Sequence, residues 1–83
     1  LTEAFLDAID RHPDAARIYA RTTPRRARTM AMAAAARARD GTRLGPLDGV
    51  PLGWKDLFDA AGTPCEAGSA LLRGRVPDGD AAV

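Results

Sequence analysis

The sequence predicts an α/β protein, of which these 83 residues form the first helices and the opening strands. Residues 1–43 carry apolar side chains at helical spacing, whereas residues 50–54 alternate as a strand does. Leu, Ile, Val and Phe make up only 15 of the 83 residues, a share below the ~20% under which a chain is doubtful as a self-sufficient globular domain. We therefore expect a helical part, residues 1–43, and a strand and loop part, residues 44–83, that together are incomplete as an independent domain.

A first helix is expected over residues 3–11. Thr2 is a residue type that caps helices, and Glu3 suits the positive end of the helix dipole. The apolar side chains of this helix share one stripe: Phe5, Leu6 and Ile9. His12 precedes Pro13 and should end the helix, because the residue before a proline avoids helical angles. Since His12 is the only histidine, we interpret it as a helix-end residue and not as a metal ligand or a base.

Residues 17–22 are expected to be extended and to lead into a second helix that ends near Asp40. Thr23-Pro24 is a typical helix start, because threonine caps and proline favours the first helical position, and Gly41 is a typical stop. Alanine lines one side of this helix: Ala27, Ala31, Ala34 and Ala38. Such a stripe has little area to bury, but it allows another backbone to approach closely.

The net charge of +1 hides an uneven distribution. Residues 17–43 carry eight arginines and one aspartate, a net charge of +7, and we call this segment the basic block. Such blocks occur in nucleic-acid-binding proteins and also on the solvated faces of ordinary helices. Tyr19 is its only aromatic residue, so the block lacks a series of rings on which bases could stack. We interpret it as a solvated face.

The remaining composition favours a cytoplasmic protein. No run approaches the ~20 apolar residues of a membrane helix, and no signal peptide is evident. Cys65 is the only cysteine, which suits a reducing compartment and excludes a disulfide framework. The chain begins with Leu1, and residues 80–83 have the pattern of a helix that is just starting, so we infer a piece of a longer protein.

Lys55 is the only lysine in a chain with eleven arginines. Lysine can lose its proton near neutral pH where its surroundings disfavour the charge, and arginine effectively cannot. Asp48-Gly49 predicts a turn that leads into a strand at residues 50–55, and Asp56 follows on the opposite side, where it would cap a turn. The strand face opposite Lys55 is expected to pack in the core: Val50, Leu52 and Trp54. The alternative is an ordinary solvated surface lysine.

A longer pattern of fixed spacings surrounds Lys55. The run Gly45-Pro46-Leu47-x-Gly49-Val50-Pro51-x-x-x-Lys55-Asp56 is followed by Gly62 and by Ala67-Gly68-Ser69. These residues resemble the N-terminal part of the amidase signature family, and Pro77-Asp78-x-Asp80-Ala81-x-Val83 resembles the start of that family's next helix. The resemblance covers roughly residues 17–83 and is densest over 44–69. It implies a mixed-sheet fold, of which residues 1–83 are the N-terminal fragment of a single amidase domain.

The resemblance implies hydrolysis of amide C–N bonds by a Ser–cis-Ser–Lys triad, in which Lys55 matches the catalytic lysine. In such enzymes a neutral lysine takes a proton from a bridging serine, and that serine takes one from the nucleophilic serine. The segment that carries both serines is absent from these 83 residues, so the chain alone is expected to be inactive. Ser69 matches neither serine and is interpreted as a turn or cap residue. Cys65 is interpreted as a small buried or half-buried side chain and not as a nucleophile.

Two other functions stay open. The first, within the same family, is the amidase subunit of a tRNA-dependent amidotransferase, in which the basic block would have a role towards tRNA and a partner subunit would be required. The second is a non-catalytic segment for packing or oligomerisation, for instance in a homodimer. The main hypothesis takes a small-molecule amide as substrate and the remainder of the amidase domain as partner. It involves no metal, organic cofactor, membrane or nucleic acid, and the substrate-binding residues cannot be read from this part of the sequence.

Overall fold

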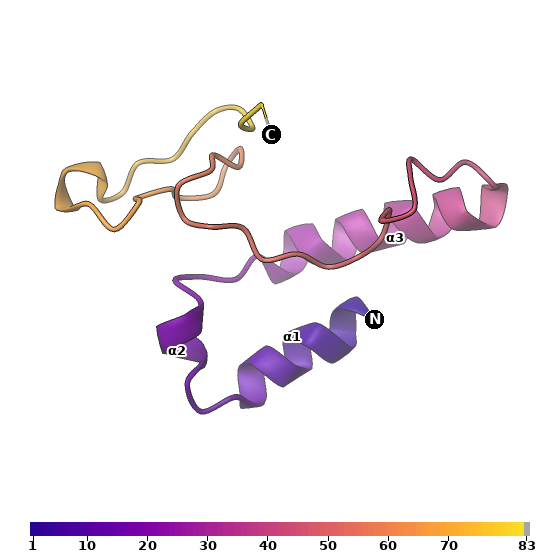
Figure 1. Cartoon of the computed structure of the whole chain (residues 1–83), viewed down its shortest axis with the longest axis horizontal. Coiled ribbons are helices and arrows are strands. Elements are labelled where there is room, and N and C mark those ends of the chain that lie inside the picture. Colours follow the sequence, from indigo (N-terminus) through magenta and orange to yellow (C-terminus); the bar gives the residue numbers. More distant parts are fainter. Residues whose placement is uncertain (83) are drawn as a thin grey trace. The chain divides into compact units, whose positions relative to one another are not determined.

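Helices connected by turns and irregular segments make up the computed structural model, which describes residues 1–82 (Figure 1). Its elements within this range are α1 (Thr2–Arg11), α2 (Ala15–Ile18), α3 (Pro24–Asp40) and a 3-10 helix, η1 (Ala70–Leu72). The chain divides into two compact units, Leu1–Leu52 and Gly53–Val83. Of the helix start expected at residues 80–83, residues 80–82 are irregular and Val83 lies outside the described residues.

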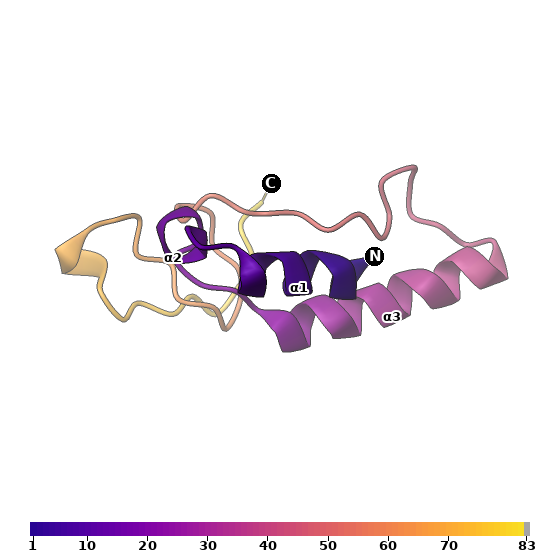
Figure 2. The ribbon, with the colours of Figure 1, turned by 90° about the horizontal axis from the view of Figure 1, so that it is seen from below.

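In the first unit, α1 begins one residue earlier than expected and lies beside α3 (Figures 1 and 2). Thr2 is therefore inside the helix and does not cap it, and Leu1 takes the cap position without a side-chain hydrogen bond. Glu3 accepts two hydrogen bonds from Arg28 of α3, from Nε at 2.6 Å and from Nη2 at 3.1 Å. These bonds lower the pKa of Glu3 and connect the two helices. The helix ends at Arg11, as Pro13 predicted.

The expectation of extended backbone at residues 17–22 is wrong for its first part. The short helix α2 occupies Ala15–Ile18, and the Tyr19 N–H donates to the Ala15 carbonyl at 2.8 Å. Ile18 and Ala20 would share one face of an extended segment, but two residues are too few to outweigh the helix propensity of the preceding Ala15, Ala16 and Arg17. Tyr19 returns to extended angles, with φ −113° and ψ 121°.

The second predicted helix is confirmed with its expected bounds. α3 starts at Pro24 and ends at Asp40, where Gly41 takes the left-handed conformation with φ 70° and ψ 23°. The Thr42 N–H then donates to the Arg37 carbonyl at 2.9 Å, which satisfies one of the last helix carbonyls. Thr23 holds the cap position but makes no side-chain cap hydrogen bond.

The segment after α3 folds back onto the alanine side of the helix, as the alanine stripe predicted (Figure 1). Ala34 is buried, with 7% of its surface exposed. Three more alanines of the stripe are half-buried: Ala27, Ala31 and Ala38. Gly49 has a φ of 96°, which side chains rarely adopt, and a Cβ built on it would lie 3.4 Å from the Ala34 Cβ. Small residues on both sides therefore allow the two backbones to approach.

Asp48 attaches this segment to α3. Its carboxylate oxygens accept from Arg37 Nε at 2.7 Å and from Nη2 at 2.6 Å, and Oδ2 also accepts from the Leu44 N–H at 3.2 Å. The predicted turn around Asp48-Gly49 is confirmed, with the Val50 N–H donating to the Leu47 carbonyl at 3.0 Å. The Asp48 side chain is 8% exposed, and the hydrogen bonds from Arg37 lower its pKa from 3.8 to about 2.

The strand expected at residues 50–55 is not formed. The β-bridge found within residues 1–82 is an isolated one, Ala60 to Thr63, and it closes a tight turn. A strand is stabilised by hydrogen bonds to a neighbouring strand, and nothing in the described range pairs with residues 50–55. The prediction of opening strands is therefore wrong for residues 1–82, and the mixed sheet is not confirmed.

The apolar residues of that segment do not pack in a core, contrary to expectation. Val50, Leu52 and Trp54 are 48%, 76% and 60% exposed. Trp54 instead packs edge to face with Phe58, with 5.7 Å between the ring centroids. Without a paired strand there is no second layer to cover these side chains, so an alternating pattern alone does not bury them.

In the second unit, residues 59–65 and 75–81 are hydrogen-bonded to each other (Figure 1). The Gly62 N–H donates to the Pro77 carbonyl at 3.0 Å, and the Ala61 N–H donates to Asp80 Oδ1 at 2.8 Å. The Ala81 N–H closes the far end of the pair on the Asp59 carbonyl at 2.9 Å. These bonds hold two irregular segments together without forming a ladder.

The Arg37–Asp48 pair predicts a specific pH dependence. Because folding lowers the pKa of Asp48, its stabilising effect is complete above its usual 3.8 and is lost as the pH falls through about 2. In the protein that contains this chain, Arg37→Ala should raise the pKa of Asp48 towards 3.8, as measured by carboxyl-carbon NMR titration with labelled aspartate. Arg39→Ala, at an exposed position of the same helix, is the control and should leave that pKa unchanged. An unshifted Asp48 in the parent protein would contradict the pair.

Candidate active site around Lys55

Lys55 lies at the start of a turn in the second unit. Its carbonyl oxygen accepts from the Leu57 N–H at 2.7 Å and from the Phe58 N–H at 3.2 Å. The Lys55 side chain is exposed, so the described residues do not supply surroundings that would disfavour its charge. The turn therefore defines the backbone at Lys55 while its amine is open to groups from outside.

Asp56 connects this turn to the rest of the unit. Its Oδ1 accepts from the Glu66 N–H at 3.2 Å, and Glu66 Oε2 accepts from the Gly74 N–H at 2.6 Å. The sequence predicted a local role for Asp56 as a cap, but this bond spans ten residues. Through these two hydrogen bonds, the residue after Lys55 is connected to the loop that follows η1.

A second polar cluster joins Asp59, Cys65 and Arg75. Arg75 Nη1 and Nη2 donate to the two carboxylate oxygens of Asp59, each at 2.7 Å. This pairing lowers the pKa of Asp59 and raises that of Arg75. Burial, followed by a hydrogen bond with Asp59, raises the pKa of the Cys65 thiol, which is 5% exposed. The prediction of a buried, small side chain at Cys65 is confirmed, and its raised pKa disfavours the thiolate that a nucleophile needs.

The structural roles predicted for Ser69 and His12 are also confirmed. Ser69 caps η1, because its hydroxyl oxygen accepts from the Leu71 N–H at 3.3 Å. His12 follows α1, and its Nδ1 accepts from the Asp14 N–H at 3.1 Å.

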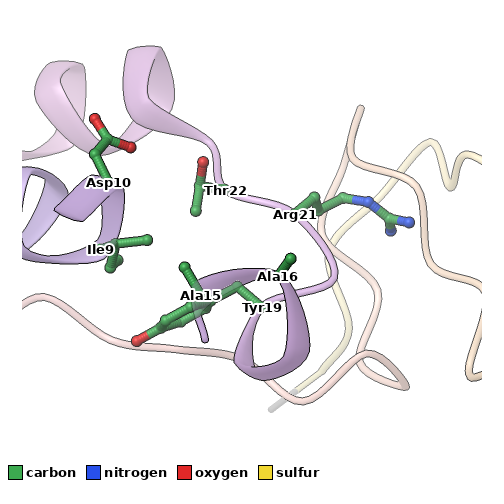
Figure 3. Close-up of a pocket in the computed structure, with 7 residues that line it drawn as sticks. All are labelled: Ile9, Asp10, Ala15, Ala16, Tyr19, Arg21 and Thr22. Carbon is green, nitrogen blue, oxygen red and sulfur yellow. The ribbon is translucent and has the colours of Figure 1, made fainter. Parts of the chain in front are cut away.

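An open depression of about 300 Å³ lies in the first unit (Figure 3). Seven residues line it: Ile9, Asp10, Ala15, Ala16, Tyr19, Arg21 and Thr22. Tyr19 contributes an aromatic ring to the lining, and Asp10 is the one acidic residue among the seven (Figure 3). Lys55 is not among the lining residues, and we assign no chemistry to this depression.

Around Lys55, the sequence analysis missed the long-range links Asp56–Glu66 and Asp59–Arg75. Their partners are 10 and 16 residues apart, in a segment with little regular secondary structure. Neither helical nor strand periodicity applies to such separations, so no local signal in a single sequence could have found them.

Comparison with known proteins decides the family. The family model described as Amidase matches residues 1–83, the whole chain. The chain belongs to the amidase family. The resemblance inferred from the residues around Lys55 is therefore confirmed, and it extends to the first residue.

Relatives of this amidase chain include the A subunit of glutamyl-tRNA(Gln) amidotransferase from Chloroflexus aggregans and the protein of the same name from Brucella ovis. Each is 42% identical to it over 83 residues, 100% of this chain. The chain spans 17% of the length of either relative. No solved structure matches it.

Membrane-spanning and metal-binding features are not found in the part of the amidase chain that the structure describes. Over residues 1–82, none of the helices combines the length and the apolar character required to cross a membrane. In the same range, His, Cys, Asp and Glu side chains do not gather in groups of three or more that could hold a metal ion.

The Cys65 environment predicts slow alkylation. Because burial and Asp59 disfavour the thiolate, the native protein should react with iodoacetamide at Cys65 more slowly than the same protein unfolded in urea, as followed by peptide mass spectrometry. Asp59→Ala should speed the native reaction, whereas Asp78→Ala, at an exposed site, should not. Native labelling at the unfolded rate would show that the thiol is not sheltered in this way.

Proposed function

We propose that the protein containing this amidase chain cleaves amide C–N bonds, and that Lys55 is the base of a Ser–cis-Ser–Lys triad. The observation that carries this proposal is the family match over the whole chain, together with a single lysine placed within the family's motif. The exposure of Lys55 supports it as well, because the amine is open to serines supplied from elsewhere in the protein.

In the proposed reaction, the uncharged Nζ of Lys55 accepts the hydroxyl proton of the bridging serine, which accepts the proton of the nucleophilic serine. The nucleophile bonds to the amide carbon, the C–N bond breaks, and the proton returns through the same groups to the leaving nitrogen. Water then releases the acid from the acyl-enzyme. Backbone N–H groups of a glycine-rich loop would stabilise the developing oxyanion. Both serines must come from outside this chain, since its only serine is Ser69.

A lysine acts as a base only where water is largely excluded, because a low dielectric disfavours its charged form. The described residues leave Lys55 exposed, together with the apolar side chains of Leu52 and Trp54. We propose that the remainder of the amidase domain covers this segment and pairs with residues 50–55 as a strand of a mixed sheet. The relatives are several times longer than this chain, so their length suffices for such a cover.

The names of the relatives favour a second candidate, the A subunit of an amidotransferase that acts on glutamyl-tRNA(Gln). Both candidates would cleave an amide with Lys55 as the base. In the amidotransferase, however, the released nitrogen would be transferred to an acceptor. This candidate requires partner subunits, and it gives the basic block a role towards tRNA. Arg25 and Arg39 are exposed on the side of α3 that lies away from the alanine stripe, where a polyanion could reach them.

Replacement of Lys55 tests the proposed base. In the complete protein, Lys55→Ala should lower the turnover of linear amides, measured as released ammonia, by about 10²–10⁴-fold. Lys55→Arg should be equally impaired, because arginine keeps the charge but does not act as a proton acceptor. Arg73→Ala, an exposed cation of the same unit, is the control and should retain parental turnover. Turnover of Lys55→Ala within a few-fold of the parent would refute the base role.

Salt-dependent binding of tRNA distinguishes the two candidates. If the amidotransferase candidate is correct, the complete protein with its partner subunits binds tRNA at low salt, and the affinity falls steeply as salt is added. The double variant Arg25→Ala with Arg39→Ala should reduce the salt slope by about one for each phosphate interaction that it removes. Arg73→Ala serves again as the control. Absence of binding at low salt would reject the amidotransferase and leave amide hydrolysis standing.

A further inference from the structure

The turn that carries Lys55 needs an anchor. The two hydrogen bonds on its carbonyl oxygen, from Leu57 and Phe58, close the turn without attaching it to another segment. The residues before it are irregular, and the Trp54 side chain is 60% exposed. A catalytic group must be held within about 0.5 Å of its productive position. Local bonds alone do not hold the Lys55 backbone that firmly.

Asp56 supplies the attachment. It is half-buried, whereas its neighbour Lys55 is exposed, and its Oδ1 accepts from the Glu66 N–H at 3.2 Å. Glu66 is itself held, because its Oε2 accepts from the Gly74 N–H at 2.6 Å. The residue before Glu66 is fixed as well, since the Cys65 N–H donates to the Arg75 carbonyl at 3.1 Å. Asp56 thus ties the turn to a segment that is itself held by hydrogen bonds.

We infer that Asp56 is a positioning residue for Lys55. Its carboxylate anchors the turn, so the lysine Cα keeps a fixed place from which the amine can reach the bridging serine. This inference rests on the proposed role of Lys55 as the base. Because the two residues are adjacent in the chain, release of the Asp56 anchor moves the lysine backbone directly. Displacement of a reacting group by about 1 Å can lower a rate by on the order of 10²-fold.

The observed bond also indicates what the position requires. The Glu66 N–H needs an acceptor at the distance of Oδ1, and an asparagine side chain offers one with the same length and shape. A glutamate keeps the charge but places its oxygens one carbon–carbon bond further away. Geometry and charge at this position can therefore be separated by two conservative variants.

The test compares Asp56→Ala, Asp56→Asn and Asp56→Glu in the complete protein, with kcat and KM measured per folded enzyme and the thermal midpoint recorded. Asp56→Ala should lower kcat by on the order of 10²-fold with little change in KM. Asp56→Asn should retain most of kcat, and Asp56→Glu should be impaired although its charge is kept. Asp78→Asn, an exposed carboxylate of the same unit, is the matched control and should behave as the parent.

A double-mutant cycle shows whether Asp56 acts through Lys55. In the Lys55→Ala background, Asp56→Ala should cause no further loss of turnover, because the positioned group is gone. The inference is overturned if Asp56→Ala keeps the parental kcat, if Asp56→Glu is active where Asp56→Asn is not, or if both backgrounds lose the same factor. The Asn and Glu variants decide the matter even where Asp56→Ala does not fold. Full turnover of Lys55→Ala alone would instead reject the proposed base, and the positioning role with it.

Discussion

Bidentate arginine–carboxylate pairs hold the loops of both units, in the place that a core of large apolar side chains holds in other domains. Arg37 donates two hydrogen bonds to Asp48 in the first unit, and Arg75 donates two to Asp59 in the second. Bidentate, charge-assisted bonds are short and directional, so they set the geometry of loops that have little periodic structure. The apolar side chains that the structure shows as buried are Ala34, Cys65 and Pro77, which are all small. With so little apolar burial within residues 1–82, the loops depend on these polar contacts for their shape.

The scarcity of buried apolar side chains also explains the surroundings of Lys55. The turn that carries it is fixed by carboxylates and backbone groups, and its apolar neighbours remain uncovered. Hydrogen bonds can orient a side chain and still leave it in contact with water, whereas a lysine that acts as a base must also be desolvated. Orientation and desolvation would thus have different sources in the proposed enzyme. These residues would supply the first, and the remainder of the domain would supply the second.

The family of this chain is established by the comparison, whereas its reaction is a proposal. The whole chain matches the Amidase family, but it spans 17% of the relatives to which it is 42% identical. The two candidate functions share the chemistry at Lys55 and differ in where the nitrogen goes. The fate of the nitrogen depends on the partner subunits and on the acceptor, so the residues that orient Lys55 do not determine it. Within this chain, the basic block is a segment whose behaviour towards tRNA would differ between the two candidates.

Features set by a few adjacent residues were determined by the sequence itself. Pro24 and Gly41 bound α3, Asp48-Gly49 forms its turn, and Ser69 caps a short helix, because each depends on local angles or on a bond to a near neighbour. The fixed spacings around Lys55 likewise predicted the family. Tertiary structure alone decided the links from Asp48, Asp56 and Asp59 to their partners, since such pairs have no sequence period. It also decided that residues 50–55 remain unpaired, because a strand exists only when a second backbone accepts and donates its hydrogen bonds.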